Sequence, residues 1–260
     1  MRRLVRLGSV LIAAAILGLG IARAATVRIA TEASFPPFSK TEPDGSYSGF
    51  EIDLGNEVCK RADLTCKWVK MDFDGMIAAL LARKIDMIFS SISITPERQK
   101  VVDFSLPYYN TANRFIAKKG TAITFSREGL KGKTVGVYAG STQDKYLQAK
   151  YAGDVTVRGY QRVDQITADL VAGRIDMAFL AELVAADFLT SPAGADYAFV
   201  GPTIRDKQFF GPGVGAAFRK GDPLRLKVDD ALRAIYQDGT FDKISKKYFP
   251  AADIRADSNW

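Results

Sequence analysis

A run of hydroxyl residues followed by an arginine is the stretch whose residue types most clearly predict chemistry. It extends from Ser90 to Arg98 and reads Ser-Ser-Ile-Ser-Ile-Thr-Pro-Glu-Arg. Thr95 is a good N-cap and Pro96 suits the first helical position, so we expect Arg98 in the first turn of a helix. A guanidinium there, beside serine hydroxyls and free backbone N–H groups, can grip a carboxylate through two hydrogen bonds. The alternative is a capped surface helix whose arginine faces water.

A second loop with similar properties extends from Gly140 to Asp144 and reads Gly-Ser-Thr-Gln-Asp. It follows an apolar run at 134–138 and leads directly into a helical pattern. A glycine turn that opens a helix presents hydroxyls and backbone N–H groups to an anion. The same residues are also an ordinary helix cap, so this loop alone is a weak signal.

Both loops follow predicted strands in a strand-helix-strand rhythm. Strands are expected at 25–31, 66–70 and 85–89, with helices at 49–61 and after Asp74. This rhythm predicts an α/β protein with mostly parallel sheets. In such sheets ligands bind beyond the carboxyl ends of the strands, where the two loops are expected.

The rhythm is repeated within the chain. Residues 164–179 align without gaps on residues 74–89, with identical residues at eight positions that include Ile-Asp-Met. Two amphipathic units can resemble each other by chance, but the shared Ile-Asp-Met favours a two-lobe duplication. Two chain crossings, near 110–114 and 202–210, would then form a hinge that lets the lobes close.

The remaining elements complete this organisation. Strands are expected at 114–118 and 214–219, at the edges of the second unit, and the C-terminal helical segment is expected to pack on the first lobe. The predicted segments are 1–24 as a signal peptide, 25–112 as the first part of lobe 1, 113–205 as lobe 2, and 206–260 as the return to lobe 1.

The first 24 residues resemble a secretory signal peptide. Arg2, Arg3 and Arg6 precede an apolar run at 11–21, and Ala-Arg-Ala at 22–24 predicts cleavage before Ala25. The alternative is a single uncleaved anchor, although the run is short for a membrane span. Cleavage lowers the formal net charge from +7 to +3. No basic run with interleaved aromatic residues predicts nucleic-acid binding.

Two composition features restrict the chemistry further. The chain has no histidine, which removes the commonest general base and metal ligand, and with it Ser-His and Cys-His catalysis. The only cysteines are Cys59 and Cys66, and in an exported protein they favour a local disulfide over a zinc site.

Six motifs together resemble the periplasmic solute-binding proteins of ABC importers for polar amino acids (family 3), in particular the lysine/arginine/ornithine- and histidine-binding members. The motifs are Gly49-Phe-Glu-Ile-Asp-Leu, Asp72-Phe-Asp, Ser90 to Arg98, Val102-Asp-Phe-Ser, Gly140-Ser-Thr-Gln and Asp238-Gly-Thr-Phe-Asp. The resemblance covers the mature chain and implies the two-lobed type II periplasmic-binding-protein fold, with a disulfide at the two cysteine positions. It implies a monomeric periplasmic protein that delivers its ligand to a membrane permease and needs no cofactor or metal.

The resemblance also implies the ligand contacts. Arg98 would hold the α-carboxylate, with Ser91, Ser93, Ser141 and Thr142. Ser90 would contact the amine, and Phe35 and Phe73 would enclose the aliphatic stem. The acidic residues Glu32 and Glu51 would pair the side-chain cation of arginine, lysine, ornithine or histidine, although each is one methylene longer than the Asp of these relatives.

One departure from the family concerns the residue that binds the α-ammonium group. The relatives have an Asp where this chain has Ala181, followed by Glu182. Either Glu182 substitutes through a small shift, or the amine is bound differently. The second possibility leaves room for an opine or another N-substituted cationic amino acid.

Two further functions use the same fold. One is a cyclohexadienyl-dehydratase-like enzyme in which Glu32, Glu51 or Glu182 acts as general acid, if burial raises its pKa. The other is a ligand sensor that reports to a receptor instead of an importer. The resemblance favours the non-enzymatic binding protein.

Overall fold

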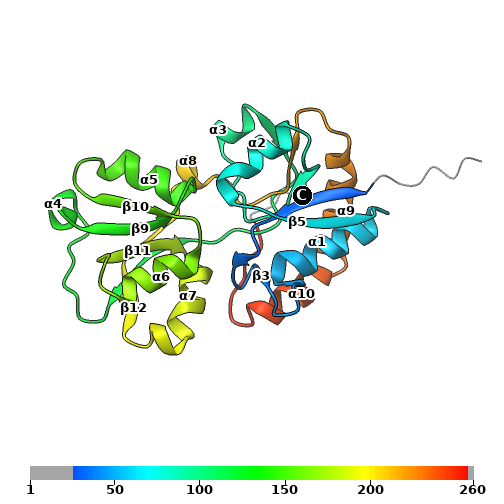
Figure 1. Ribbon diagram of the computed structural model, residues 1–260. Helices are drawn as coiled ribbons and strands as arrows, with labels where there is room; N and C mark the ends of the chain where they lie inside the picture. Colours follow the sequence, from blue (N-terminus) through cyan, green and yellow to red (C-terminus); the bar gives the residue numbers. More distant parts are fainter. Residues whose placement is uncertain (1–25, 257–260) are drawn as a thin grey trace, which may run out of the picture.

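The computed structural model describes residues 26–256, which form two lobes joined by two connections (Figure 1). The predicted signal peptide lies outside the described residues. In order across its sheet, the first lobe has strands β5 (Cys66–Lys70), β1 (Val27–Thr31), β6 (Met87–Ile88), β13 (Ala217–Arg219) and β7 (Val102–Phe104). The second lobe has β10 (Thr156–Tyr160), β9 (Thr134–Tyr138), β11 (Met177–Ala181), β8 (Asn113–Lys118) and β12 (Tyr197–Ile204).

Helices flank both sheets. The first lobe has α1 (Phe50–Arg61), the 3-10 turn η1 (Phe73–Gly75), α2 (Met76–Leu81), α3 (Pro96–Gln99), α9 (Leu224–Gln237) and α10 (Thr240–Tyr248), with a small sheet of β2 (Ser34–Phe35), β3 (Ser39–Thr41) and β4 (Tyr47–Ser48). The other helices are α4 (Arg127–Leu130), α5 (Thr142–Tyr151), α6 (Val163–Val171), α7 (Glu182–Thr190), η2 (Pro192–Gly194) and α8 (Lys207–Phe210). Across residues 26–256, none of the helices combines the length and apolar character needed to cross a membrane.

The two sheets have the same pattern of strand directions. β1 is parallel to β5 and β6, and β9 is parallel to β10 and β11. One strand in each sheet runs against the others, β13 in the first and β8 in the second. The predicted α/β class with mostly parallel sheets is confirmed.

The repeated Ile-Asp-Met motif has the same structural role in both lobes. Asp86 accepts a hydrogen bond from the backbone N–H of Arg28 at 3.0 Å, and Asp176 accepts one from Thr134 at 2.8 Å. The backbone N–H of each aspartate donates in return to the carbonyl of the same partner, at 2.8 and 2.9 Å. Each aspartate thus fixes the start of its strand against the neighbouring strand, which explains why both copies contain it.

Helix α1 begins without a side-chain cap because a proline-rich loop supplies its acceptors. The carbonyls of Pro37 and Phe38 accept from the first backbone N–H groups of α1, at 3.1 and 2.9 Å. The residue before the helix, Gly49, has a φ of 128°, and a Cβ there would lie 2.3 Å from the Phe38 carbonyl oxygen. Only glycine allows this close approach. Near the other end of α1, the predicted disulfide between Cys59 and Cys66 joins the helix to β5.

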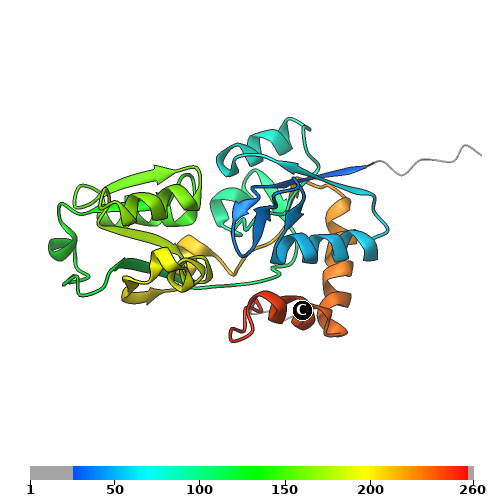
Figure 2. The ribbon, with the colours of Figure 1, turned by 60° about the horizontal axis from the view of Figure 1, so that its bottom comes forward.

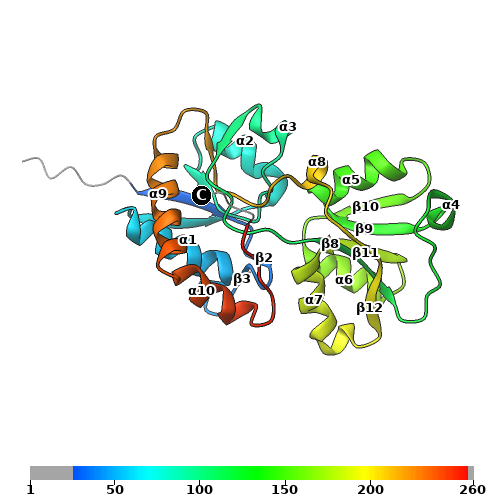
Figure 3. The ribbon, with the colours of Figure 1, turned by 180° about the vertical axis from the view of Figure 1, so that it is seen from behind.

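The two connections between the lobes run side by side near Tyr109 and Val214 (Figure 3). The backbone N–H of Val214 donates to the Tyr109 carbonyl at 2.9 Å. After this point the chain enters β13, which lies between β6 and β7 in the first sheet. The expectation that 214–219 forms an edge strand of the second unit is therefore wrong. The run is buried, and its small Ala216 and Ala217 fit the interior of a sheet.

Helix α8 packs on the second lobe, although the sequence analysis begins the return to lobe 1 at residue 206. The ring of Phe210 lies 5.5 Å from that of Tyr146 on α5 and 6.4 Å from that of Phe179 on β11. We therefore propose that the second crossing lies at 211–213 and that lobe 2 extends from 113 to about 210. The limit at 112/113 remains a proposal, which the start of β8 at Asn113 supports.

The C-terminal helices return to the first lobe, as expected (Figure 2). Phe241 on α10 is buried and packs edge-on against Phe50 of α1 with a centroid distance of 5.9 Å. The ammonium group of Lys247 lies 2.7 Å from the carboxylate of Asp53. Beyond α10, the Ile254 carbonyl accepts from the backbone N–H of Asn110 at 2.9 Å, so the C-terminal segment also supports the first connection.

Candidate functional site

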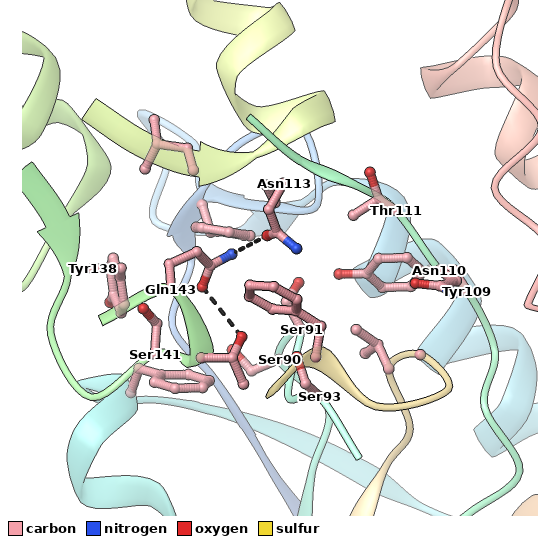
Figure 4. Close-up of a pocket in the computed structure, with 18 of the residues that line it drawn as sticks. Ser90, Ser91, Ser93, Tyr109, Asn110, Thr111, Asn113, Tyr138, Ser141 and Gln143 are labelled. Carbon is pink, nitrogen blue, oxygen red and sulfur yellow. Dashed lines mark hydrogen bonds between the residues drawn. The ribbon is translucent and has the colours of Figure 1, made fainter. Parts of the chain in front are cut away.

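A cavity lies between the lobes, at the carboxyl ends of the parallel strands and beside the two connections (Figure 4). Its wall combines residues of both lobes with residues of the connections. Nine of the eleven predicted ligand-binding residues line it: Glu32, Phe35, Phe73, Ser90, Ser91, Ser93, Arg98, Ser141 and Thr142. The two that do not are Glu51 and Glu182. The prediction that ligands bind beyond the carboxyl ends of the strands thus identified a set of residues that mostly line one cavity.

Arg98 is a buried cation without a carboxylate partner in the described part of the chain. The Thr95 hydroxyl caps α3 by accepting from the Arg98 backbone N–H, and Pro96 occupies the first turn as predicted. The guanidinium donates to the carbonyls of Ser93 at 3.0 Å and Gly140 at 3.4 Å. Only 7% of the residue is exposed, and burial lowers its pKa to about 10. A buried guanidinium held only by neutral carbonyls is a strong binding site for a carboxylate.

The start of α5 faces Arg98 from the second lobe. The Ser141 hydroxyl caps the helix by accepting from the backbone N–H of Asp144 at 3.2 Å, and Thr142 is the first helical residue. Both hydroxyl residues are buried at the cavity wall. The positive end of this ten-residue helix adds to the attraction for an anion at Arg98.

Glu32 is a buried carboxyl group without a cation at ion-pair distance among the described residues. Its carboxylate accepts from the Ser34 hydroxyl at 2.9 Å, and its backbone N–H donates to the Ser90 hydroxyl at 3.0 Å. Burial raises the pKa of Glu32 to about 7, and the nearby Glu51 carboxylate adds to the rise. Hydroxyl groups of Tyr138 and Ser34 act in the opposite direction. Among the described residues, the cavity therefore contains an unpaired guanidinium and an unpaired carboxyl group, and the two do not pair with each other.

Glu51 lies behind the cavity wall. Its carboxylate accepts from the backbone N–H and the hydroxyl of Ser91, at 2.7 and 2.8 Å, and from the Tyr108 hydroxyl at 2.5 Å. Ser91 has a φ of 49°, a strained conformation for a serine. Glu51 is fully buried, and burial raises its pKa. In this arrangement it holds Ser91 in place and does not reach the cavity, because the first turn of α1 faces the back of the serine loop.

Glu182 also lies outside the cavity, while the preceding Ala181 lines it. Glu182 is the first residue of α7, and its carboxylate lies 3.5 Å from the guanidinium of Arg114. Glu182 is thus absent from the cavity wall among the described residues. The wall at Ala181 is therefore apolar.

Aromatic rings form the middle of the cavity. The ring of Tyr138 packs edge-on against Phe35 at 5.9 Å and against Phe73 at 5.7 Å between centroids. The guanidinium carbon of Arg98 lies 5.4 Å from the centre of the Phe73 ring. Phe35 and Phe73 belong to the first lobe and Tyr138 to the second, so the three rings meet only where the lobes meet.

Several lining residues were missed by the sequence analysis. Besides Tyr138, they include polar residues at the first connection and on α5: Tyr109, Asn110, Thr111, Asn113 and Gln143. The Gln143 amide donates to Asn113 at 2.6 Å and accepts from the Thr142 hydroxyl at 3.3 Å (Figure 4). The polar run at a predicted crossing was an available signal, since crossings border the space between lobes. Tyr138 ends a strand that leads into the Gly140 loop, which was the corresponding signal there.

Comparison with known proteins identifies relatives over most of the chain. Residues 27–251 match the family model described as bacterial extracellular solute-binding proteins, family 3. The chain is 46% identical over 227 residues to the lysine/arginine/ornithine-binding periplasmic protein of Escherichia coli K12, covering 86% of this chain and 87% of that protein. It is 47% identical over 228 residues to an L-arginine-binding protein of Pseudomonas aeruginosa, with the same coverage.

A solved structure supports the fold. A Salmonella typhimurium periplasmic binding protein with high arginine specificity superimposes with a TM-score of 0.81 at 30% identity, covering 87% of this chain and all of that one. The two lobes and their mixed sheets correspond to the type II periplasmic-binding-protein fold. The relatives are binding proteins and not enzymes, which removes support for the dehydratase alternative. With the family model, the curated relatives and the fold in agreement, the chain belongs to the bacterial extracellular solute-binding proteins of family 3.

Proposed function

We propose that this chain is the periplasmic substrate-binding component of an ABC importer and that it captures arginine, lysine or ornithine between its lobes. The observation that carries the proposal is the pair of buried ionisable groups, Arg98 and Glu32, that share one cavity without an ion-pair partner among the described residues. A ligand with a carboxylate and a distant cation satisfies both at once. Relatives named for arginine or for lysine, arginine and ornithine add support.

In this proposal each group of the ligand has a partner of suitable chemistry. The α-carboxylate binds Arg98 and the start of α5, with Ser141 and Thr142 as donors. The aliphatic stem lies between Phe35 and Phe73. The cationic head binds Glu32, and its charge lowers the pKa of that carboxyl again. Glu51 acts indirectly, by fixing Ser91.

The α-ammonium group has no carboxylate partner beside Ala181 in this assignment. The apolar surface of Ala181 offers it no carboxylate, so hydroxyl and carbonyl oxygens such as that of Ser90 must accept its hydrogen bonds. This observation supports a second candidate, an opine or another cationic amino acid whose nitrogen carries a substituent. The added group would lie against Ala181.

A ligand screen separates these candidates. The mature protein, unfolded to release bound ligand and then refolded, is heated with arginine, lysine, ornithine, histidine, octopine and norvaline. A ligand at 1,000 times its Kd adds about 4 kcal/mol to the free energy of unfolding and so raises Tm. We expect arginine, lysine or ornithine to do so, with calorimetry then giving Kd. A response to octopine alone would replace the ligand in this proposal, and silence from every cationic ligand would refute it.

The cellular setting belongs to the same proposal. We infer export with cleavage before Ala25, a periplasmic location, a monomeric state and a permease partner. The mass of the exported protein tests the cleavage site, and light scattering tests the monomer. Small-angle scattering with and without ligand tests lobe closure. Uptake in a strain lacking the gene separates an importer component from a sensor.

A further inference from the structure

Tyr138 is not among the expected ligand contacts, yet it is the described cavity residue whose buried side-chain hydroxyl has no well-formed hydrogen bond. Only 5% of the residue is exposed, and its hydroxyl has no well-formed hydrogen bond within residues 26–256, although it lies near enough to Glu32 to lower the pKa of that carboxyl. A buried hydroxyl without a partner costs free energy. The ring is held by edge-on packing against Phe35 and Phe73, which fixes where the hydroxyl lies.

Among the carboxylates that act on this hydroxyl, Glu32 on the opposite lobe has the largest effect, and both residues line the cavity. Burial raises the pKa of Tyr138, and the Glu32 carboxylate raises it further, so the phenol stays protonated and neutral. A tyrosine hydroxyl has one donor and two acceptor positions, whereas an ionised carboxylate only accepts. Placed near Glu32, the hydroxyl can donate to the carboxylate and still accept from a cationic head.

We propose that Tyr138 is a specificity-determining residue of the second lobe, whose hydroxyl accepts a hydrogen bond from the ligand's cationic head while its ring closes the aromatic slot of Phe35 and Phe73. This rests on the proposed function. The remaining recognition of the head comes from the first lobe, through Glu32. Tyr138 therefore makes closure sensitive to the side chain of the ligand, and not only to its carboxylate.

A kinetic consequence separates this role from general packing. Because the hydroxyl belongs to the second lobe, its bond to the head forms only in the closed complex. Its loss should therefore speed dissociation and leave association nearly unchanged. Replacing tyrosine by phenylalanine keeps the ring and removes only the hydroxyl.

The test compares Tyr138→Phe with a matched control, Tyr160→Phe. Tyr160 is paired in register with Tyr138 on the adjacent strand, but its hydroxyl donates to Asp169 at 2.7 Å and lies outside the cavity. We expect Tyr138→Phe to weaken arginine binding about tenfold, mainly through a faster off-rate, and the control to bind like the wild type. Norvaline, which has the stem of arginine without its head, should bind both variants and the wild type equally.

The outcomes distinguish the two proposals. If the wild type binds arginine and Tyr138→Phe changes its Kd less than twofold, the role of Tyr138 is refuted and the proposed function stands. An equal loss for norvaline would also refute it, since it would show a packing effect. If the wild type binds no cationic amino acid, both proposals fail. A double-mutant cycle with Glu32→Gln adds a readout that misfolding would not mimic. The double variant should lose less affinity for arginine than the product of the two single-variant factors predicts.

Discussion

Arginine binding should depend on pH between 6 and 8 because of one carboxyl group, that of Glu32. Burial raises its pKa to about 7 in the ligand-free protein, so about half of the molecules carry a proton there at neutral pH. A cationic head needs the ionised form. If the complex contains only that form, the observed Kd is the limiting value multiplied by 1 plus the ratio of protonated to ionised carboxyl. The Kd at pH 6 is then about ten times that at pH 8.

The stability of the ligand-free protein should change in the opposite direction. A carboxyl whose pKa is higher in the folded state holds its proton more tightly there, so its contribution to stability is complete below pH 4.5 and is lost as pH rises through 7. The difference in pKa corresponds to about 3 kcal/mol. Bound arginine removes this penalty, so the increase in Tm on adding ligand should be larger at pH 8 than at pH 6.

Calorimetry at pH 6 in two buffers with different ionisation enthalpies tests this directly. At that pH we expect nearly one proton, about 0.9, to be released for each arginine bound. The variant Glu32→Gln should bind more weakly at pH 8 and lose the dependence on pH. A Kd that is constant from pH 6 to 8 in the wild type, with proton release below about 0.2, would refute the assignment of Glu32 to the cationic head.

Three other substitutions test separate parts of the site and fold. Arg98→Ala should weaken arginine binding at least a hundredfold, because the ligand carboxylate then has no guanidinium partner. As a control, Arg205→Ala should leave the Kd unchanged, since Arg205 is exposed. If calorimetry shows that Arg98→Ala retains micromolar affinity, Arg98 is not the anchor. Glu51→Gln should weaken arginine and norvaline by similar factors, because it acts through Ser91; a loss confined to arginine would instead place Glu51 in contact with the head. Cys59→Ser should lower the free energy of unfolding by about 2 kcal/mol and Tm by roughly 5 °C in thermal melts; an unchanged Tm would mean that the disulfide adds nothing to stability.

The sequence was sufficient to predict which loops line the cavity because the rule behind that prediction is topological. Strands of one direction end at the same edge of a sheet, so Ser90 to Arg98 and the loop at Gly140 had to approach each other once a two-lobed arrangement was expected. The ionisable groups of the cavity, Arg98 and Glu32, could be predicted from their residue types. The sequence predicted Arg98 in the first turn of a helix capped by Thr95, and the structure has it there.

Other features depend on contacts that local sequence does not encode. Tyr109 reaches the cavity through its pairing with Val214, a residue 105 positions later. Whether Glu51 faces the ligand or the back of the serine loop depends on the rotation of α1 and on the unusual φ of Ser91. Tyr138 ends a strand with an apolar pattern, which favours a core position, and only the facing lobe shows that its hydroxyl borders the site.

The position of β13 has a consequence for the order in which the chain folds. β13 lies between β6 and β7, so the first sheet cannot be completed until residue 219 is available, whereas all strands of the second sheet lie between residues 113 and 204. Contacts that are close in sequence form at a lower cost in loop entropy. The second lobe can therefore fold as a local unit, whereas the first sheet also needs β13, which comes later in the chain. Since β13 directly follows the second crossing, we expect the first sheet to be completed in the same step that sets the hinge.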